Sequence, residues 1–412
     1  MNKIKCLLQN IAQRWHQHSL AFRIVIGLVF GLLLGLFVPQ ARWISIFGKL
    51  FVGALKAIAP VLVFILVASA LSRSHNDLSD KFRTLIFRYV LTTFIAATVA
   101  IIASCLFPLK LQLTDAATGD SMESIGNLFE NILLDIFTNP ISAISNANYL
   151  SILFWALLTG IALKKMASPT TCHIVSDLAD ATSQIVKWVI QCAPFGIMGL
   201  VFNAISENGL DIFTTYGILL LLLVGCMLFC TFVTNPIIVG IIIKGNPFPL
   251  LFQCLKESGI PAFFTRSSAA NIPVNMQLCE KLGVDRDFYS VAIPLGSTIN
   301  MDGAAVTITV MTMATCHTLG IEVDIVQALL LSLMASAAAC GASGVAGGSL
   351  LLIPMACSLF GISNDVAMQV VGVGFIIGVI QDSVETALNS SNDVLYIIAA
   401  DLQEKRRQKE NQ

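Results

Sequence analysis

The chain has 412 residues, of which 24 are basic and 25 acidic, so charged side chains make up 12% of it and hydrophobic residues 56%. Soluble globular chains are about 25% charged, and the mean hydropathy of +0.81 also sets this chain apart from them. The composition excludes an ordinary soluble enzyme and a nucleic-acid-binding protein, which would need a basic surface, and it predicts an integral protein of the lipid bilayer. The net charge of −1 says little, because in a membrane protein the sign of the charge matters loop by loop.

The first half of the chain contains six uncharged apolar segments. A helix needs about 20 apolar residues to cross the hydrocarbon core of a bilayer. Segments without any charged residue cover 24–41, 57–72, 89–109, 136–163, 188–206 and 212–243. We therefore expect six spans, the fourth of them long enough to be broken or bent near residues 146–148. Residues 1–23 are polar and mixed, without the pattern of a cleavable signal.

The charges between the spans predict the orientation of the chain. Basic residues gather before the first span, after the second, fourth and sixth spans, and in the C-terminal segment that contains Lys405. The intervening loops are acidic or nearly neutral, with Asp115 and Asp120 in one and Glu207 in another. Because cytoplasmic loops carry the excess of Lys and Arg, we expect every second loop and both termini on the cytoplasmic side.

Two segments of the second half differ from simple spans. Residues 248–277 are too polar for one, and residues 325–364 are uncharged but rich in Gly, Ala and Ser. The centres of both segments, 266–273 and 340–349, disfavour a continuous helix. For the second centre, a small-residue contact between helices is one interpretation. The other is a pair of half-membrane hairpins whose irregular tips line a cavity.

The order of the elements favours the hairpins. Each is followed by an apolar helix that carries polar residues, so the pair of hairpin and polar helix occurs twice, at about 250–318 and 325–402. Counted by crossings, the first pair starts from the cytoplasmic side and the second from the outside. An inverted repeat with broken helices at its centre is the architecture of a secondary transporter.

The last of these helices carries a stripe of polar residues. Asp382, Thr386, Asn389 and Asp393 are spaced i, i+4, i+7 and i+11, which places them on one helical face, and Glu385 lies beside it. Carboxylates at membrane depth are costly unless they bind something positive. A solvated helix end is the alternative for Asp393, whereas the long uncharged segment before Asp382 argues against it there.

A second polar cluster, Asn-Met-Asp-Gly at residues 300–303, interrupts the preceding apolar helix. Its Asp302 is another carboxylate within the membrane, and Gly303, with Gly296 seven residues earlier, favours an unwound stretch that exposes carbonyl oxygens. Carboxylate, amide and backbone oxygens suit an alkali or alkaline-earth cation rather than zinc or copper. A pump or a channel could use the same cluster.

The tip of the first hairpin adds groups that bind anions. Ser267 and Ser268 would present hydroxyl and backbone N–H groups near helix N-termini, and both favour a carboxylate ligand. Asp382 would supply the partner for an ammonium group. Together with the oxygen ligands for a cation, these residues describe a site for a zwitterion and a coupling ion.

Three of these stretches resemble one known family. TRSSAANIP at 265–273, PLGSTINMDG at 294–303 and DSVETALNSSND at 382–393 are similar to motifs of the dicarboxylate/amino acid:cation symporters, the glutamate-transporter family. The resemblance implies an all-α polytopic membrane protein with eight transmembrane helices and two re-entrant helical hairpins in inverted repeats. In that family, the second hairpin gates the outside, and the substrate-bearing domain moves as an elevator within a homotrimer.

The resemblance also implies a division of the chain. Residues 1–245 would form six spans, mostly scaffold and trimer contact, with spans three and six joining the transport domain. Residues 246–412 would form the transport core. Its parts would be hairpin one at 248–280, span seven at 287–318, hairpin two at 325–360 and span eight at 365–402.

Roles of single residues follow from the same resemblance. The expected substrate-binding residues are Ser267, Ser268, Val345, Ala346, Gly347, Asp382, Glu385, Thr386 and Asn389. Among them, Asp382 would bind the amino group, and Ser268 with the backbone of hairpin two would bind the α-carboxylate. The expected sodium ligands are Gly296, Asn300, Asn389 and Asp393 in one site, Thr298 with carbonyls of hairpin two in a second, and Thr92, Thr93, Asn300 and Asp302 in a third.

Two positions depart from the carriers of acidic amino acids in this family. Those carriers have an arginine where this chain has Glu385, and a threonine where it has Ala304. A substrate carboxylate beside Glu385 would be repelled, so we expect a small neutral amino acid. Serine or threonine fits a pocket that can hydrogen-bond a hydroxyl, and alanine or cysteine is the alternative. The pattern resembles the bacterial serine/threonine:sodium symporters, which implies the bacterial inner membrane.

Two further positions concern the balance of buried charge and the coupling ion. Arg266, at the tip of hairpin one, is expected either to pair with Glu385 and neutralise two buried charges, or to set with it the gap between the substrate and the hairpin. The proton-carrying acid of some family members corresponds to Ile308, which cannot titrate. Sodium alone is therefore expected to drive uptake.

An intramembrane serine protease is the rival interpretation, because Gly-Ala-Ser-Gly at 341–344 matches a GxSG pattern. Such chemistry needs a base, usually histidine, within reach of the serine. All five histidines precede Ser343, and only His317 is near a span. We therefore expect no enzyme and no catalytic residue. A channel is the remaining alternative, which saturable and sodium-dependent flux would exclude.

Overall fold

The computed structural model describes residues 20–72, 80–113, 137–209, 212–342 and 347–410, and the regular elements among these residues are all helical. The elements of the first half are α2 (Leu20–Phe37), η1 (Arg42–Ile44), α3 (Ser45–Ser72), α4 (Asp80–Leu106), α6 (Pro140–Ser145), α7 (Tyr149–Met166), α8 (Pro169–Gln191), α9 (Ala193–Asn208), α10 (Ile212–Phe229), the π-helical turn η3 (Cys230–Thr234) and α11 (Asn235–Ile243). The elements of the second half are α12 (Phe248–Cys254), the π-helical turn η4 (Leu255–Gly259), α13 (Ile260–Thr265), α14 (Ser268–Lys281), α15 (Arg286–Ile299), α16 (Asp302–Leu319), α17 (Ile325–Ala339), η5 (Ser349–Leu352), α18 (Ile353–Ser358) and α19 (Asn364–Glu410).

Several of these helices are long and apolar enough to cross a membrane. Among the described residues, four reach this length by themselves, at 42–69, 81–106, 214–243 and 364–408, and the bent pair α8–α9 counts as a fifth. The predicted break in the fourth span is confirmed, because α6 ends at Ser145 and α7 begins at Tyr149. Asn139 and Asn148 accept backbone N–H groups at the two helix starts, as helix N-caps do.

The fifth predicted span, 188–206, is wrong at its start. Helix α8 begins about twenty residues earlier, at Pro169, and meets α9 at a bend of 54°. Helix α8 is amphipathic and carries Asp177, Asp180 and Lys187. A search for uncharged segments therefore stops at Lys187, although charges on one face of an amphipathic helix do not interrupt it.

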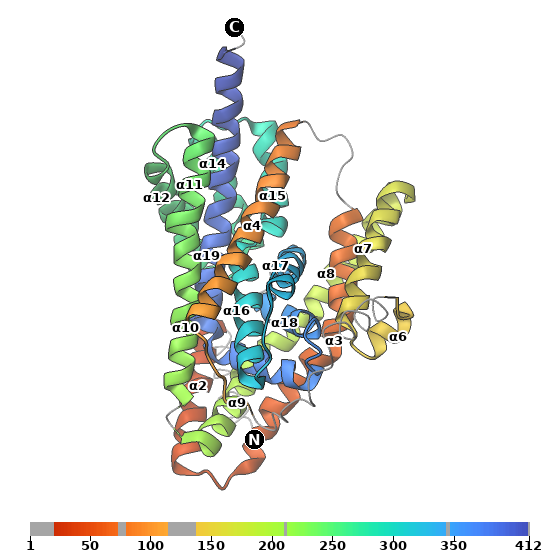
Figure 1. The fold of residues 1–412 in the computed structure, drawn as a ribbon, viewed down its shortest axis with the longest axis vertical. Helices are drawn as coiled ribbons and strands as arrows, with labels where there is room; N and C mark the ends of the chain where they lie inside the picture. Colours follow the sequence, from red (N-terminus) through yellow and green to blue (C-terminus); the bar gives the residue numbers. More distant parts are fainter. Residues whose placement is uncertain (1–19, 73–79, 114–136, 210–211, 343–346, 411–412) are drawn as a thin grey trace, which may run out of the picture.

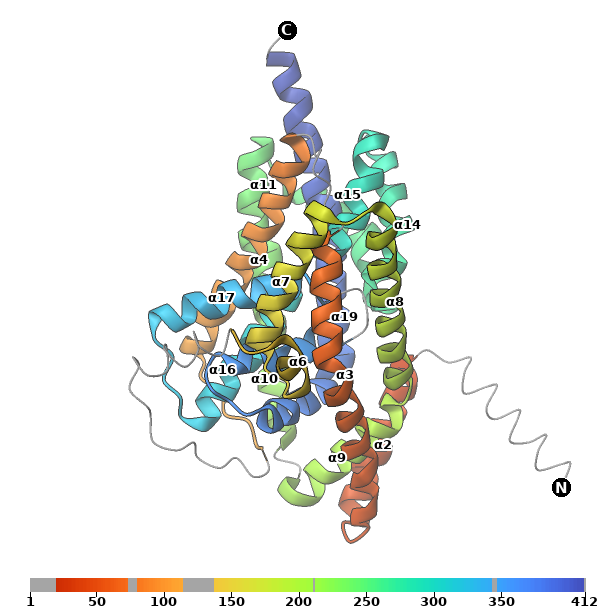
Figure 2. The same ribbon diagram turned by 90° about the vertical axis from the view of Figure 1, so that its right-hand side faces the viewer.

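The long helix α19 is the central element of the fold. It runs through much of the length of the molecule and projects at the C-terminus (Figures 1 and 2), and most of its membrane-length window is buried. Helices α10 to α18 pack against it or against α16, which is buried from Asp302 to Cys316. The polar stripe of α19 therefore lies in the interior of the protein and not against lipid.

The two predicted hairpins occupy different halves of the molecule. Hairpin one (α12, η4, α13 and α14) lies toward the end where the C-terminus projects, and hairpin two (α17, η5 and α18) lies in the other half (Figures 1 and 2). The tip of hairpin one turns at Arg266, whose φ of 53° is left-handed. At the tip of hairpin two, Gly347 has a φ of 73°, and a Cβ there would meet the Phe375 ring at 2.9 Å. Only glycine suits that position.

A buried polar network fastens hairpin one to α19. Asn271 of α14 donates to the Ser258 carbonyl at 3.1 Å and to Ser390 Oγ at 2.8 Å. Asn275 donates to the same Ser390 hydroxyl at 3.0 Å, and Ser258 donates to Asn275 Oδ1 at 2.5 Å. Ser258 lies in the π-helical turn η4, so this irregular arm of hairpin one is bonded both to α14, the other arm, and to Ser390 of α19.

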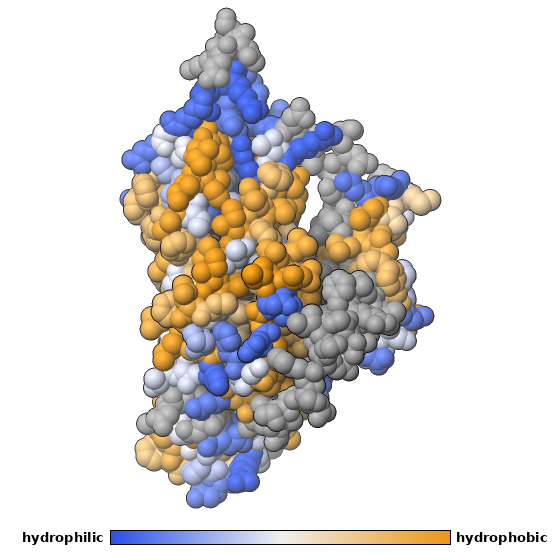
Figure 3. Space-filling model, in the orientation of Figure 1, coloured by the Kyte–Doolittle hydropathy of each residue, from blue (hydrophilic) through white to orange (hydrophobic). Residues whose placement is uncertain are grey.

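The outer surface fits a bilayer environment. Apolar side chains cover much of the middle of the face in Figure 3, and hydrophilic ones gather at the end from which the C-terminus projects. Large apolar side chains such as Leu221, Ile241 and Phe264 are exposed on the helices. A soluble monomer rarely exposes so much apolar surface.

Candidate functional site

The tips of both hairpins meet the same carboxylate of α19. Arg266 Nε donates to Asp382 Oδ2 at 2.6 Å, and the backbone N–H of Gly347 donates to Asp382 Oδ1 at 3.1 Å. The Arg266 Nη2 group also donates to the Gly378 carbonyl at 3.4 Å. The side chains of Arg266 and Asp382 are almost fully buried, so this is an ion pair in the interior. Asp382 therefore joins hairpin one, hairpin two and α19.

The expected pairing of Arg266 with Glu385 is wrong. The Arg266 guanidinium lies on Asp382, and Glu385 is satisfied by neutral groups instead. Its Oε2 accepts hydrogen bonds from Thr307 Oγ1 (2.8 Å), Ser349 Oγ (2.9 Å) and Gln381 Nε2 (2.5 Å). Asp382 and Glu385 lie within one helical turn of each other on α19, and Arg266 reaches the carboxylate that also binds hairpin two.

The neighbours of Glu385 form a buried polar cluster with it. Thr307 belongs to α16, Ser349 to hairpin two and Gln381 to α19, so three elements converge there. Gln381 Nε2 also donates to the Thr307 hydroxyl at 2.7 Å. Ala304 is fully buried one turn before Thr307. Thr307, Ser349 and Gln381 were not among the predicted site residues, although each is a polar residue in an otherwise apolar segment.

The serines of hairpin one stand at a helix start, as predicted. Ser267 is the N-cap of α14, and its hydroxyl accepts the Ala270 N–H at 3.2 Å. Ser268 is the first residue of that helix and is buried. The backbone N–H groups of a helix start favour an anion. Of the other residues expected to bind substrate, Thr386 is buried on α19, and Val345 and Ala346 lie outside the described residues.

The break between α15 and α16 is confirmed at Asn300 and Met301. Helix α15 ends at Ile299 and α16 begins at Asp302, so the two residues between them are not helical. Asn389 of α19 faces the break. Its Oδ1 accepts the Gly303 N–H at 2.8 Å, and its Nδ2 donates to Met301 Sδ at 3.3 Å.

The first group of expected sodium ligands comes together beside the break. Asn300 Nδ2 donates to Asp393 Oδ1 at 3.0 Å. A Cβ on Gly296 would meet Asp393 Oδ1 and the Tyr89 hydroxyl, each at 3.0 Å. Asn300 Oδ1 and Asp393 Oδ2 are buried acceptors that receive no hydrogen bond from the described residues. Buried acceptors without donors fit a cation, because an unpaired buried polar atom is otherwise costly.

The third group gathers around Asp302. Its Oδ1 accepts from Thr93 Oγ1 at 3.1 Å, and its Oδ2 accepts from Asn235 Nδ2 and Asn392 Nδ2, both at 3.2 Å. Thr92 is buried and donates to the Tyr89 carbonyl at 3.0 Å. The two asparagines were not predicted as members of this group.

For the second group of expected sodium ligands, the structure shows the fewest contacts between its members. Thr298 Oγ1 donates to the Leu295 carbonyl of its own helix at 2.9 Å. Its expected partners are carbonyls of hairpin two, whose tip falls partly outside the described residues. Within the described part of the chain, no cluster of three or more His, Cys, Asp or Glu is arranged around a metal position.

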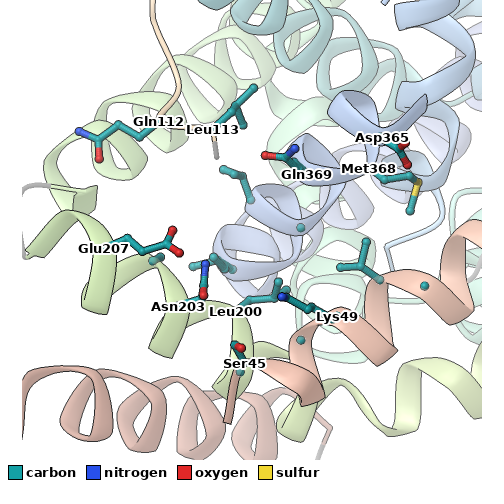
Figure 4. A pocket seen from close by; sticks show the side chains of 18 of the residues that line it. Ser45, Lys49, Gln112, Leu113, Leu200, Asn203, Glu207, Asp365, Met368 and Gln369 are labelled. Atoms are coloured by element: carbon teal, nitrogen blue, oxygen red, sulfur yellow. The ribbon is translucent and has the colours of Figure 1, made fainter. Parts of the chain in front are cut away.

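A separate cavity of about 390 Å³ lies between α3 and α9 on one side and α19 on the other. Figure 4 shows polar side chains from these helices around it, among them Lys49, Asn203 and Glu207. Lys56 and Asp365, which also line it, form an ion pair between α3 and the start of α19. The cavity does not include the residues around Asp382, so it is distinct from the expected substrate site.

Comparisons with known proteins agree with the motifs. The family model described as the sodium:dicarboxylate symporter family matches residues 20–401. The serine/threonine transporter SstT of Bifidobacterium adolescentis is 56% identical over 402 residues, which cover 97% of this chain and 94% of that protein. The proteins of the same name from Streptococcus agalactiae serotype Ia and Streptococcus thermophilus are 57% and 54% identical over 396 residues, 96% of this chain and 98% of each relative.

These matches confirm the resemblance that three short stretches suggested, and they extend it to nearly the whole chain. They also decide against the serine protease, whose Ser343 lies outside the described residues. The protein is a transporter and not an enzyme. The chain belongs to the sodium:dicarboxylate symporter family.

Proposed function

We propose that this chain is a sodium-coupled symporter that takes up serine and threonine by elevator-type alternating access. Its relatives carry the name serine/threonine transporter, and its family is named for sodium symport. The observation that carries the proposal is the convergence of both hairpin tips on Asp382. An ammonium group bound there is enclosed from both sides, which alternating access requires.

The site offers a partner for each group of a hydroxy amino acid. Asp382 takes the ammonium, and Ser268 with the backbone of the hairpin-two tip takes the α-carboxylate. All the hydrogen bonds that Glu385 accepts from Thr307, Ser349 and Gln381 go to Oε2. Its Oε1 can therefore accept the substrate hydroxyl. Alanine and cysteine offer it no comparable donor, so the buried polar cluster around Glu385 favours serine and threonine over them.

Arg266 stands in for the substrate ammonium in this structure. Its guanidinium holds Asp382 Oδ2, which leaves the buried carboxylate neutralised without a substrate. Substrate binding must displace Arg266 or share Asp382 with it. The exchange of one cation for another keeps the charge of the interior balanced, which lowers the cost of burying it.

The two oxygen clusters are the proposed sodium sites. Asp393 and Asp302 face no ion-pair partner among the described residues, unlike Asp382. A sodium ion at each would neutralise a buried carboxylate and satisfy acceptors such as Asn300 Oδ1. Binding of the ions and of the zwitterion would then be coupled through the break between α15 and α16. Asn300 and Asp302, at this break, belong to the two clusters, and a Cβ built on Gly303 would lie 3.0 Å from Cγ of Glu385, the proposed partner of the substrate hydroxyl.

The proposed arrangement of spans, hairpins and domains rests on the same family membership. We infer eight spans and two hairpins, with residues 1–245 mainly as scaffold and trimer contact, residues 246–412 as transport core, and both termini cytoplasmic in a bacterial inner membrane. The cavity of Figure 4 lies along the border between these parts, with α3 and α9 on one side and α19 on the other. Relative movement of the parts would change its shape.

Uptake of labelled serine into proteoliposomes tests the function directly. We expect saturable uptake that requires an inward sodium gradient and is inhibited by excess threonine. Alanine and cysteine should compete more weakly, and aspartate should not compete. Uptake in the absence of sodium, or inhibition by aspartate equal to that by threonine, would contradict the proposal.

Gly296→Ala should raise the sodium requirement of uptake. The added methyl group would lie 3.0 Å from Asp393 Oδ1 and from the Tyr89 hydroxyl, so it must displace groups of the proposed cation site. We expect the half-saturating sodium concentration to rise about fivefold or more, which corresponds to about 1 kcal/mol. Gly53→Ala is the matched control, because a Cβ at that helical glycine meets nothing within 4 Å. An unchanged sodium requirement would count against the site.

A further inference from the structure

The sixth predicted span contains a π-helical turn at Cys230–Thr234. The N–H of Asn235 donates to the Cys230 carbonyl, five residues back instead of four. A π-helical turn inserts one residue into the helix, and one residue corresponds to a rotation of about 100°. The helix that follows is therefore turned relative to the helix that precedes it.

The buried face of α10 shows what an unbroken helix would do. Leu219, Leu223 and Met227 are fully buried at successive turns. Continued with a regular period, the same face would reach Ile237 and Ile241. In the structure those two side chains are 59% and 73% exposed. The face that packs inward before the turn therefore points outward after it.

The inward face after the turn begins with an asparagine. Asn235, Val239 and Ile242 are at most 7% exposed, and they lie one or two positions later than Thr234, Ile237 and Ile241, which the regular period predicts. The π-helical turn thus directs the amide of Asn235 into the protein, where an uninterrupted helix would place Thr234. Π-helical turns are frequent at functional sites, because they persist only where something offsets their strain.

The amide of Asn235 is held at both of its ends. Its Nδ2 donates to Asp302 Oδ2 at 3.2 Å, and its Oδ1 accepts the Tyr396 hydroxyl at 3.0 Å. Asn392 donates to the same Asp302 oxygen, and Thr93 donates to the other. All of these side chains are buried. Asp302, the first residue of α16, is therefore held by residues of three other segments: α4, α11 and α19.

The donors that reach Asp302 from the described residues are all neutral. They solvate and orient the carboxylate but leave its negative charge without a cationic partner. Asp382 differs, because Arg266 already pairs with it. Hydrogen bonds from neutral amides are the arrangement that keeps a buried carboxylate both aligned and able to attract a small cation.

We propose that Asn235, turned inward by the π-helical turn and anchored by Tyr396, is a positioning residue for sodium coupling. It holds the Asp302 carboxylate in one orientation next to the break that contains Asn300, whose Oδ1 is an unpaired buried acceptor among the described residues. This rests on the proposed sodium coupling and adds to it a residue from the sixth span, outside the expected ligand groups.

The test uses the full-length protein purified in detergent, without any amino acid. Its unfolding temperature is measured against sodium chloride, with choline chloride keeping the ionic strength constant. For Asn235→Ala we expect the half-maximal sodium concentration to rise about tenfold. In proteoliposomes at saturating sodium, the half-saturating serine concentration should change less than about twofold, because Asn235 acts on the ion and not on the amino acid.

Tyr396→Phe separates positioning from a merely structural role. The change removes the hydroxyl that anchors Asn235 and should raise the sodium requirement about threefold. The double variant Asn235→Ala with Tyr396→Phe should need no more sodium for its half-maximal effect than Asn235→Ala alone, because the tyrosine acts through the asparagine. If Asn235→Ala does not fold, Tyr396→Phe alone decides by the same sodium titration.

Thr231→Val is the matched control in the same helix. Thr231 is equally buried, but its hydroxyl donates to the Met227 carbonyl of its own helix at 3.0 Å. It should change the unfolding temperature without moving the sodium midpoint. A lower unfolding temperature of Asn235→Ala with an unchanged sodium midpoint would overturn the inference. Absence of any sodium effect on the unaltered protein would instead refute the proposed coupling itself.

Discussion

Replacing Asp382 by asparagine should reduce sodium-driven serine uptake about a hundredfold or more. Asp382 is the carboxylate on which Arg266 and the Gly347 N–H converge, and it is the proposed partner of the substrate ammonium. Truncating one partner of a buried charge pair costs about 2–5 kcal/mol, which corresponds to at least a thirtyfold change in affinity. The measurement is initial uptake of labelled serine over a range of serine concentrations, in proteoliposomes with a fixed sodium gradient.

The same variant should also be less stable, because it leaves the Arg266 guanidinium buried without its partner. A double variant, Asp382→Asn with Arg266→Gln, separates the two effects. It removes both charges, so the unfolding temperature should recover toward that of the unaltered protein. Uptake should stay lost, because the ammonium still has no carboxylate. Recovery of uptake in the double variant would show that Asp382 serves the fold and not the substrate.

Much of the site could be predicted from single residues because the membrane makes them conspicuous. A carboxylate is so costly in an apolar segment that Asp302 and Asp382 each indicate a buried site by their position in the sequence alone. For Asp393 the sequence left a solvated helix end as the alternative, and the structure places this residue in the interior. The break at Asn300 followed from the glycines around it. Where one strong physical cost acts on one residue, the sequence predicts the outcome reliably.

The pairing of these residues could not be predicted in the same way. Asp382 and Glu385 lie within one turn of the same helix, and the structure pairs Arg266 with Asp382. Glu385 in turn finds donors on Thr307 and Ser349, which come from other elements. Such choices depend on distances of a few ångströms between segments that lie far apart in the sequence.

The π-helical turn before Asn235 could not be predicted for a related reason. Residues 212–243 form a uniformly apolar run, which predicts a span of sufficient length but says nothing about its internal rotation. The irregularity becomes visible only when the buried face is seen to shift between Met227 and Val239. The start of α8 was mispredicted for a different reason. Its charged residues lie on one face of an amphipathic helix, and the search for uncharged segments excluded them.

Glu385→Gln should weaken serine binding and admit aspartate. The Glu385 carboxylate is buried, and two like charges about 4 Å apart repel by about 4 kcal/mol at an effective dielectric constant of 20. Removing that repulsion should lower the inhibition constant of aspartate at least about tenfold. The serine hydroxyl would lose a charged acceptor, a loss of about 1.5–3 kcal/mol, so the half-saturating serine concentration should rise about tenfold or more. Competition assays with labelled serine measure both quantities.

Thr307→Val separates the effect of the Glu385 charge from the effect of the polar side chains packed around it. Thr307 donates to Glu385 Oε2 at 2.8 Å, so its replacement disturbs these side chains but keeps the carboxylate. Serine affinity should fall severalfold, while aspartate should remain excluded. If Thr307→Val admits aspartate as readily as Glu385→Gln does, the fit of the pocket governs selection. If only Glu385→Gln admits it, the buried negative charge is what keeps acidic amino acids out and makes this member of the family a carrier of neutral ones.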